Sequence, residues 1–209
     1  MGIRFKEIMF RQQTLLMDQK TEPEINISGL TYIPDFISAQ EQDSLLAHID
    51  QQYWLTDLKR RVQHYGYKYD YKARAMGNDA YLGQLPDWLL SVSKKLHDDD
   101  IFSSVPDQVI INEYLPGQGI SAHIDCVPCF ADTIASLSLG SPCIMDFSNP
   151  KTGEKNSIVL EERSLIVLSG PARYEWQHAI PARKSDVIDS IKTERTRRVS
   201  LTFRNVILN

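Results

Sequence analysis

The chain has 209 residues, of which 42% are hydrophobic and 24% are charged, with ten glycines and ten prolines. This composition is typical of a soluble globular domain and excludes a collagen-like, coiled-coil or wholly disordered protein. Lysine and arginine together number 23 against 27 aspartate and glutamate residues, which gives a net charge of -4. Any contact with nucleic acid must therefore use a local basic patch, because the overall field does not attract phosphate.

Signals for a membrane or for secretion are weak in this chain. No stretch approaches the roughly 20 apolar residues of a membrane span, and polar residues interrupt the N-terminal segment where a secretory signal would be apolar. The three cysteines, Cys126, Cys129 and Cys143, are too few and odd in number for a disulfide framework. We therefore expect no membrane partner and an intracellular, reducing location, namely the cytoplasm or, in a eukaryote, the nucleus.

The first elements follow a polar N-terminal segment. Residues 1–24 are weakly patterned, and we interpret them as an extension of one domain that covers residues 25–209. Residues 25–33 alternate well enough to predict a strand. Ser38 and Glu41 have the spacing of a capping box, which predicts the start of a helix. A second helix is expected from Pro86, where a proline is harmless and an apolar stripe follows at helical spacing.

From residue 108 onward, short β-rich runs follow one another closely, separated by turns rich in glycine and proline. The predicted strands are residues 109–115, 120–125, 133–147, 158–160, 165–168, 174–180 and 199–207. Such close spacing is typical of a β-sandwich or jelly roll and leaves no room for crossover helices. The chain is therefore expected to be mostly β with flanking helices, an α+β class.

A candidate metal site lies in this β-rich half. His123 and Asp125 are two residues apart in a predicted strand, so their side chains project from the same face. His178 could complete a set of two histidines and one carboxylate, the arrangement that leaves open positions on Fe(II). A surface pair or a hydrogen-bonded core histidine remains the alternative for these residues taken alone.

A candidate anion site lies on the last predicted strand. Arg198 and Arg204 fall on one face of an alternating segment, and two guanidinium groups suit a small dicarboxylate. Asn112 and Tyr114, again two residues apart, could contact the same dianion. The alternatives are an exposed basic face for the arginines and buried hydrogen-bonding positions for the other two.

The acidic chain carries one local basic patch, in residues 54–77. Its basic residues are Lys59, Arg60, Arg61, Lys68, Lys72 and Arg74, against Asp57 and Asp70, an excess of four positive charges. Tyr65, Tyr67, Tyr69 and Tyr71 alternate within it, so an extended ribbon would present four rings on one side. Aromatic stacking and phosphate attraction hold single-stranded or flipped bases. A ribbon stabilised only by aromatic neighbours is the alternative.

Several of these segments together resemble one known family. They are NEYLPG at 112–117, the His123 and Asp125 pair, SLSLG at 136–140, WQHAI at 176–180 and the segment from Arg198 to Arg204. They are similar to the AlkB family of Fe(II)- and 2-oxoglutarate-dependent dioxygenases over roughly residues 25–207. The resemblance implies a double-stranded β-helix (jelly-roll) core.

The resemblance also implies roles for individual residues. By position, His123, Asp125 and His178 match the iron ligands. Arg198 matches the arginine that binds the distal carboxylate of 2-oxoglutarate, and Arg204 matches the arginine near its iron-chelating end. Asn112 and Tyr114 match hydrogen-bond partners of the same co-substrate.

The family chemistry consumes 2-oxoglutarate and O2, releases succinate and CO2, and hydroxylates a C–H bond. On an N-methylated base the product loses formaldehyde, whereas on a carbon centre the hydroxyl group stays. We therefore expect an oxidoreductase that demethylates N-alkylated bases in single-stranded or flipped-base DNA or RNA. The alternatives are hydroxylation of a modified tRNA base or of a protein side chain, and a catalytically silent nucleic-acid-binding module. We expect a monomer.

The resemblance assigns residues of about 54–80 to a nucleotide-recognition lid. The lid residues expected to contact substrate are Arg61, His64, Tyr65, Tyr67 and Tyr69. Arg173, just before His178, is expected to line the pocket, with a packing role as the alternative.

The chain departs from the bacterial repair prototype of the family at Val127. The prototype carries an acidic residue at this place, two positions beyond its metal-binding aspartate, so its base-reading contacts do not transfer directly. The neighbouring Cys126 and Cys129 fit a redox or zinc element, although the sequence has no second such pair.

Overall fold

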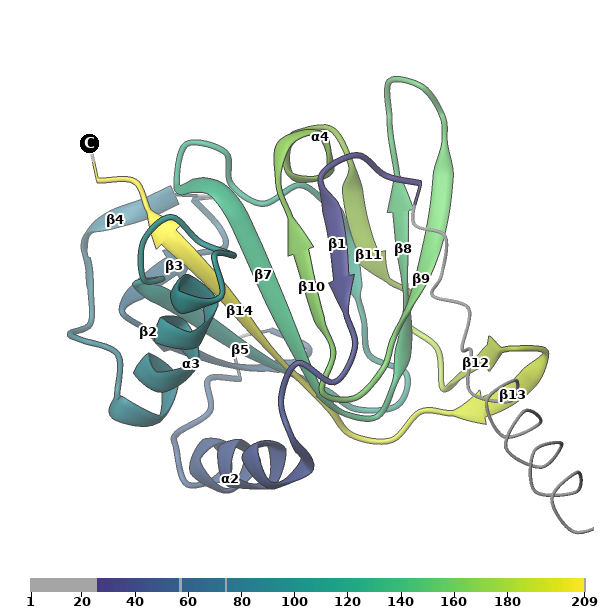
Figure 1. Ribbon diagram of the computed structural model, residues 1–209, viewed down its shortest axis with the longest axis horizontal. Helices are drawn as coiled ribbons and strands as arrows, with labels where there is room; N and C mark the ends of the chain where they lie inside the picture. The colour runs from purple at the N-terminus through teal and green to yellow at the C-terminus, as the bar shows by residue number, and fades with distance from the viewer. Residues whose placement is uncertain (1–25, 57, 74, 209) are drawn as a thin grey trace, which may run out of the picture.

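The computed structural model describes residues 26–56, 58–73 and 75–208 (Figure 1). Antiparallel sheets dominate, with helices packed on one side, which confirms the mostly β class expected from the sequence. The proposed extension, residues 1–24, lies outside the described residues. None of the described helices is both long enough and apolar enough to cross a lipid bilayer.

The larger sheet has six strands in the order β1-β10-β7-β14-β5-β2, and every neighbouring pair is antiparallel. Its strands are β1 (Leu30–Ile33), β10 (Leu165–Leu168), β7 (Phe130–Gly140), β14 (Arg198–Val206), β5 (Gln108–Tyr114) and β2 (Arg61–Tyr65). The last strand in the chain, β14, lies in the interior of this sheet between β7 and β5.

The smaller sheet has four strands in the order β6-β11-β8-β9. Its strands are β6 (Ile120–His123), β11 (Gln177–Ile180), β8 (Cys143–Ser148) and β9 (Lys155–Leu160). Buried side chains from both sheets, including Tyr114, Phe147 and Ile166, form one apolar cluster. The two sheets therefore pack face to face, as expected for a jelly roll.

Two ribbons and a short helix accompany the two sheets. One ribbon pairs β3 (Tyr67–Asp70) with β4 (Ala75–Tyr81), and the other pairs β12 (Ser185–Ile188) with β13 (Ile191–Glu194). The short helix α4 (Gly170–Tyr174) connects β10 to β11. In Figure 1 the β12–β13 ribbon projects from the lower right of the molecule.

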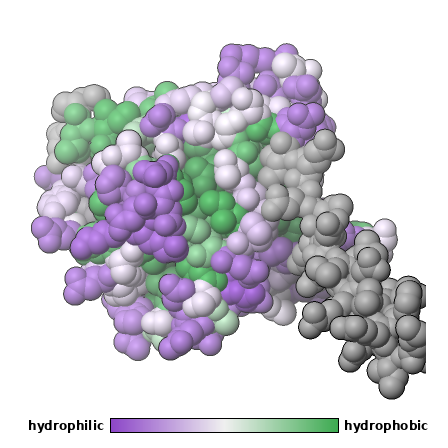
Figure 2. All heavy atoms as spheres, viewed as in Figure 1, coloured by the Kyte–Doolittle hydropathy of each residue, from purple (hydrophilic) through white to green (hydrophobic). Residues whose placement is uncertain are grey.

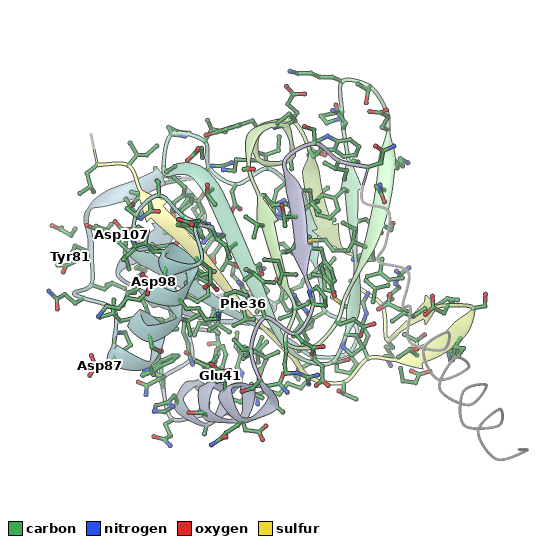
Figure 3. The ribbon with its side chains drawn as sticks, viewed as in Figure 1. Phe36, Glu41, Tyr81, Asp87, Asp98 and Asp107 are labelled. Carbon is green, nitrogen blue, oxygen red and sulfur yellow. A yellow bond between two sulfur atoms is a disulfide. The ribbon has the colours of Figure 1, made fainter. Side chains whose placement is uncertain are left out.

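Helices α2 (Ala39–Asp50) and α3 (Asp87–Asp98) cover the outer face of the larger sheet (Figure 1). The predicted capping box is present, because Ser38 Oγ accepts from the Glu41 N–H while the Glu41 carboxylate accepts from the Ser38 N–H. Figure 3 shows Glu41 at the start of α2 and Asp87 and Asp98 at the two ends of α3. Figure 2 shows hydrophobic side chains gathered over β7 and β10, beside the helices.

Strand β14 connects the two layers of the core. Its residues Val199, Leu201 and Phe203 are buried in the cluster that includes the apolar faces of α2 and α3. The alternate residues, from Arg198 to Arg204, point to the opposite face and line a cavity between the sheets. Because side chains alternate along a strand, one strand supplies both a hydrophobic core and a polar site.

The structure corrects several predicted boundaries. The run 133–147 is two strands, β7 and β8, because Gly140 takes a positive φ of 77° and starts a turn. The run 174–180 begins in α4, so its strand starts only at Gln177. The predicted strand at 25–33 is shorter, since β1 starts at Leu30. The remaining strands agree with prediction to within a few residues.

The predicted four-tyrosine ribbon is interrupted. Gly66 separates β2 from β3 with a φ of 73°, and a Cβ atom there would lie 1.8 Å from the Asp107 carbonyl oxygen. The chain turns at this glycine, so β2 joins the larger sheet while β3 pairs with β4. Tyr65 and Tyr67 therefore belong to different sheets and not to one aromatic face.

A buried carboxylate ties α2 to the sheet. The Glu113 side chain is 2% exposed and accepts from Arg61 Nε at 2.6 Å and from Arg197 Nε at 2.7 Å. Arg197 also pairs with Asp50, the last residue of α2. Burial acts to raise the pKa of Glu113, but the hydrogen bonds from the two arginines outweigh it and hold the pKa below its ordinary value. Glu113 therefore remains ionised and bridges three elements.

Replacement of Glu113 should destabilise the fold. For Glu113→Gln we expect the free energy of unfolding to fall by about 1–3 kcal/mol, because buried hydrogen bonds to charged groups are lost. Urea denaturation followed by circular dichroism measures this change. In the control, Asp35→Asn breaks the exposed Asp35–Arg163 pair and should cost less than about 1 kcal/mol. Equal losses for the two variants would contradict the assignment.

The same comparison has a defined pH dependence. Since the folded pKa of Glu113 is lowered, its stabilising effect is present above the unfolded pKa, near 4.5, and is lost as the pH falls through the folded pKa. The stability difference between the wild type and Glu113→Gln should therefore shrink as the pH is lowered below about 4.5.

Candidate active site

A cavity of about 1020 Å³ lies between the two sheets. Its walls come from both sheets, from β3 and from the segment before β2. All seven residues predicted to bind metal or co-substrate line it, namely His123, Asp125, His178, Asn112, Tyr114, Arg198 and Arg204. The fold thus brings together residues that are up to 92 positions apart in the sequence (112 to 204).

The candidate metal ligands form a compact group. In the pairing of β6 with β11, His123 lies directly opposite His178, and their ring centroids are 4.4 Å apart. Asp125 Oδ1 lies 3.5 Å from His123 Nε2. One ligand atom from each of the three side chains lies within 4.8 Å of the others. Among the residues that the structure describes, this is the only such group of histidine, cysteine and acidic side chains.

The predicted reason for this convergence was only half right. Strand β6 ends at His123, so Asp125 is not in the strand. Its side chain is instead held by Arg204, whose Nε donates to Asp125 Oδ2 at 2.9 Å. Arg204 also donates to the Gln108 side chain, and its guanidinium lies 4.8 Å from the centre of the Phe130 ring.

The protonation states suit a metal ion. His123 Nδ1 lies 2.8 Å from the Ser121 carbonyl oxygen, so a proton on Nδ1 leaves Nε2 free as a ligand. Burial lowers the pKa of His178 to about 4, which keeps this imidazole neutral near pH 7. Burial acts to raise the pKa of Asp125, but Arg204 and His123 hold it well below its ordinary value.

A buried nitrogen atom without a hydrogen-bond partner also indicates that the site suits a metal. His178 Nδ1 is buried and has no hydrogen-bond partner among the described residues. Two imidazoles and one carboxylate, converging from one side, match the facial set that binds non-haem Fe(II) and leaves positions open. These three residues could therefore hold a divalent transition metal.

The opposite part of the cavity is suited to an anion. Arg198 is 3% exposed and donates Nη2 to Ser138 Oγ at 2.8 Å, but its Nε and Nη1 have no partner among the described residues. Leaving buried donors unpaired costs about 1–3 kcal/mol each. The Tyr114 ring lies 5.4 Å from this guanidinium, and burial raises the pKa of the Tyr114 hydroxyl, which stays protonated. A carboxylate would satisfy these donors.

Of the residues predicted to contact substrate, only Tyr69 lines the cavity. Arg61 is bound instead to Glu113, and it lies over the Trp54 ring at 4.8 Å. His64 is half-buried and does not line the cavity, and burial lowers its pKa to about 4. Its ring lies 5.8 Å from that of Tyr71.

The other predicted tyrosines also point elsewhere. Tyr65 packs edge-on against Trp88 of α3 and donates its hydroxyl to Gln63. Tyr67 pairs with Tyr81 across the β3–β4 ribbon, with ring centroids 5.1 Å apart. The turn at Gly66 explains both corrections, because it ends the alternation on which the prediction depended.

Arg173 does not line the cavity either. It is 2% exposed, and its guanidinium donates to main-chain carbonyl groups, including that of Asp125 at 2.9 Å. The prediction of a pocket-lining role is therefore replaced by a role behind the pocket.

Three further lining residues belong to the predicted basic and aromatic patch but were not among the residues expected to contact substrate. Tyr71 and Arg60 line the cavity together with Lys59. Arg60 Nε donates to Asn112 Oδ1 at 2.8 Å, and its guanidinium lies 5.8 Å from the Tyr71 ring. The basic run pointed to this segment, but the sequence alone does not separate Arg60, which faces the cavity, from its neighbour Arg61.

Cys126 and Cys129 are joined by a disulfide in the structure. The turn between them is closed by the Cys129 N–H, which donates to the Cys126 carbonyl oxygen at 3.3 Å. Neither sulfur belongs to a group of metal-binding side chains in the described part of the chain. The disulfide directly follows Asp125 and therefore adjoins the candidate metal site.

Comparisons with known proteins agree with this geometry. Residues 29–204 match the 2OG-Fe(II) oxygenase superfamily. The chain is 36% identical to "Alkylated DNA repair protein ALKBH8 homolog" of Arabidopsis thaliana, over 98% of this chain and 67% of that protein. It is 38% identical to "tRNA (carboxymethyluridine(34)-5-O)-methyltransferase ALKBH8" of Mus musculus, over 85% of this chain and 30% of that protein. This chain thus matches under a third of the mouse protein.

A solved structure has a similar fold. "The structure of OsALKBH1" superimposes with a TM-score of 0.66 and covers 85% of this chain and 96% of that one, at 17% sequence identity. At this identity the likeness concerns the fold alone.

Substitution of Arg198 should weaken the binding of 2-oxoglutarate without weakening the binding of the metal. For Arg198→Gln we expect the Kd for 2-oxoglutarate to rise about 10- to 100-fold, because charge-assisted hydrogen bonds of about 1.5–3 kcal/mol are lost. The affinity for Mn(II) alone should be unchanged. Anaerobic calorimetry with Mn(II)-loaded protein measures both constants.

The matched control for this experiment is the neighbouring residue. Arg197 points to the helix side and binds Asp50 and Glu113, so Arg197→Gln should change the Kd for 2-oxoglutarate by less than about 2-fold. A similar loss in both variants would exclude a specific role for Arg198.

Proposed function

The chain belongs to the AlkB family of the 2OG-Fe(II) oxygenase superfamily and is a dioxygenase, and on this premise we propose that it oxidises an alkyl group on a nucleic-acid base, with Fe(II), 2-oxoglutarate and O2. One observation carries the proposal above the others. The cavity that holds the two-histidine, one-carboxylate group also contains a buried arginine, Arg198, with donors that lack partners among the described residues. A nucleic-acid-binding module without catalytic activity would need neither this group of three ligands nor the buried arginine.

In this proposal His123, Asp125 and His178 hold the iron. When bound, the iron and its co-substrates supply the oxidation, in which 2-oxoglutarate becomes succinate and CO2 and one oxygen atom enters a substrate C–H bond. Arg204 orients the Asp125 carboxylate through its hydrogen bond and keeps it ionised. Arg198 holds the distal carboxylate of 2-oxoglutarate.

The rest of the cavity wall orients and shields the co-substrate. Tyr114 stays protonated and can donate to a carboxylate, and Asn112 lies beside it on β5. Apolar side chains from both sheets, such as Ile166 and Met145, also line the cavity. They exclude water and strengthen the electrostatic contacts of the arginines.

Features of the cavity wall and of the neighbouring β3–β4 ribbon support a base as the substrate. Tyr69 and Tyr71 line the cavity with Arg60, and Lys59 beside them is exposed. The ribbon next to this wall carries the exposed Lys68 and Lys72. Aromatic rings for a base and basic side chains for phosphate are the two attractions that hold an unpaired nucleotide.

The leading reaction is oxidative demethylation of an N-alkylated base in DNA or RNA. The hydroxymethyl product of such a base releases formaldehyde and restores the base. The second candidate is a stable hydroxylation of a modified tRNA base. It is favoured by Val127, an apolar, half-exposed residue of the cavity wall at the place of the prototype's acidic residue. The tRNA-related name of the mouse relative points the same way.

Two further expectations accompany the proposal. We expect the protein to act as a monomer and to reside in the cytoplasm or, in a eukaryote, the nucleus.

The proposal is tested by mass spectrometry of protein incubated with Fe(II), ascorbate, 2-oxoglutarate and air. The substrate panel contains methylated single-stranded DNA, duplex DNA, RNA and bulk tRNA. Succinate together with a loss of about 14 mass units from a base identifies a demethylase, and a gain of about 16 identifies a hydroxylase. Succinate without any change in a base would instead favour a protein substrate. Failure to bind either iron or 2-oxoglutarate would overturn the enzyme assignment.

Neutralising the exposed lysines of the cavity wall and of the neighbouring β3–β4 ribbon should weaken binding of nucleic acid. For the triple variant Lys59→Gln, Lys68→Gln and Lys72→Gln, we expect the slope of log K against log salt to fall by up to about 2, because each phosphate that a lysine neutralises on a single strand contributes about 0.7 to the slope. Fluorescence anisotropy with a labelled single strand at several salt concentrations measures the slope.

A control variant carries Lys94→Gln and Lys192→Gln, which remove exposed lysines of α3 and β13. Its slope should equal that of the wild type. If the triple variant and the control behave alike, the nucleic acid does not cross the β3–β4 ribbon.

A further inference from the structure

Arg173 is buried behind the candidate metal site, and all hydrogen bonds that its side chain makes within the described residues go to one segment, residues 125–131. Its guanidinium donates to the carbonyl oxygens of Asp125 at 2.9 Å, Cys126 at 3.2 Å and Phe130 at 3.4 Å. A fourth bond, also of 3.4 Å, goes to the Ala131 carbonyl oxygen. All four acceptors lie within residues 125–131, which comprise the loop that begins with a candidate metal ligand and the first two residues of β7.

This arrangement is unusual for a buried arginine. Guanidinium groups in protein interiors are normally paired with carboxylates, because the loss of hydration costs several kcal/mol. No carboxylate in the described residues forms a salt bridge with Arg173. Main-chain carbonyl groups of the single segment 125–131 satisfy it instead, so the side chain serves to hold that segment.

Arg173 is close in the chain to one candidate metal ligand, His178, and contacts the main chain of another, Asp125. It lies in α4, and the chain then passes directly into β11, which carries His178. The loop that Arg173 holds starts at Asp125, which follows β6. Arg173 therefore joins the element before one candidate ligand to the segment that carries another.

Other contacts hold the loop that starts at Asp125, but the three described next do not reach α4. The disulfide between Cys126 and Cys129 closes the loop on itself. The Cys129 carbonyl oxygen accepts from the Ile207 N–H, which ties the far end of the loop to the segment after β14. Arg204 fixes the Asp125 carboxylate but not its main chain. Strand β7 itself packs against α4, so what Arg173 adds is a connection from α4 to the main chain of Asp125 and Cys126.

We infer that Arg173 is a positioning residue of the metal centre. It fastens the main chain of Asp125 and Cys126 to α4, and so it sets the separation of Asp125 from His178 that a single metal ion requires. It touches neither metal nor substrate, and it acts through the main chain of Asp125. This inference rests on the proposed function, since it takes His123, Asp125 and His178 as the metal ligands.

The test compares two buried arginines. Arg195 is 8% exposed and also donates to a carbonyl oxygen, that of Pro181, as well as to the Asp186 carboxylate in the β12–β13 ribbon. Arg173→Gln and Arg195→Gln each remove buried hydrogen bonds and should both lower the free energy of unfolding. Only Arg173→Gln should weaken metal binding, by about 10- to 100-fold, as expected when a group that orients a ligand is lost.

The measurement is the Kd for Co(II) alone, followed by its visible absorption on anaerobic protein, at a temperature where circular dichroism shows each variant folded. Arg173→Lys keeps a charge and up to three donors, and it should recover part of the affinity. Activity is not needed for this readout.

The outcomes are distinguishable. If the wild type binds Co(II) and Arg173→Gln binds it equally well, the positioning role is wrong while the proposed function stands. An equal loss of affinity in Arg195→Gln would reduce the effect to general destabilisation and would also overturn the role. A wild-type protein that binds no Co(II) would overturn the metal centre itself, and with it the inference.

Discussion

Burial of both faces of β14 is the constraint on which the rest of the structure depends. The strand pairs with β5 and β7 in the interior of the larger sheet, so both of its edges are covered, and most of its residues are buried. One face needs apolar side chains to pack against α2 and α3. The other needs polar side chains for the cavity. A shift of register by one residue would exchange the two faces, which would bury Arg198 and Arg204 in the hydrophobic core.

The electrostatic character of the cavity follows from this arrangement. Arginine side chains from the inner face of β14 are desolvated, and their charges are balanced unequally. Arg204 has a carboxylate partner in Asp125, whereas the donors of Arg198 are only partly satisfied by the described residues. The imbalance leaves a net positive potential at one end of the cavity. A site of this kind favours an anion before any metal is considered.

Sequence reasoning succeeded where the signal was local and periodic. The capping box at Ser38, most β runs and the alternation that placed Arg198 and Arg204 on one face all appear in the structure. It failed in residues 61–71, because a turn at Gly66 assigns alternate tyrosines to different sheets. It also failed at Arg173, since an arginine beside a site looks the same in sequence whether it faces the ligand or supports the loop behind it. Only three-dimensional packing separates these cases.

The interior place of β14 also has a consequence for biosynthesis. Strands β5 and β7 are made well before it, and they meet only through it. Until β14 leaves the ribosome, both strands keep an open edge, which is a hazard for aggregation during synthesis. The pocket likewise lacks both of its β14 arginines until that moment. A growing chain therefore cannot assemble the anion site early. The pocket is complete only in a chain in which β14 has paired with both β5 and β7.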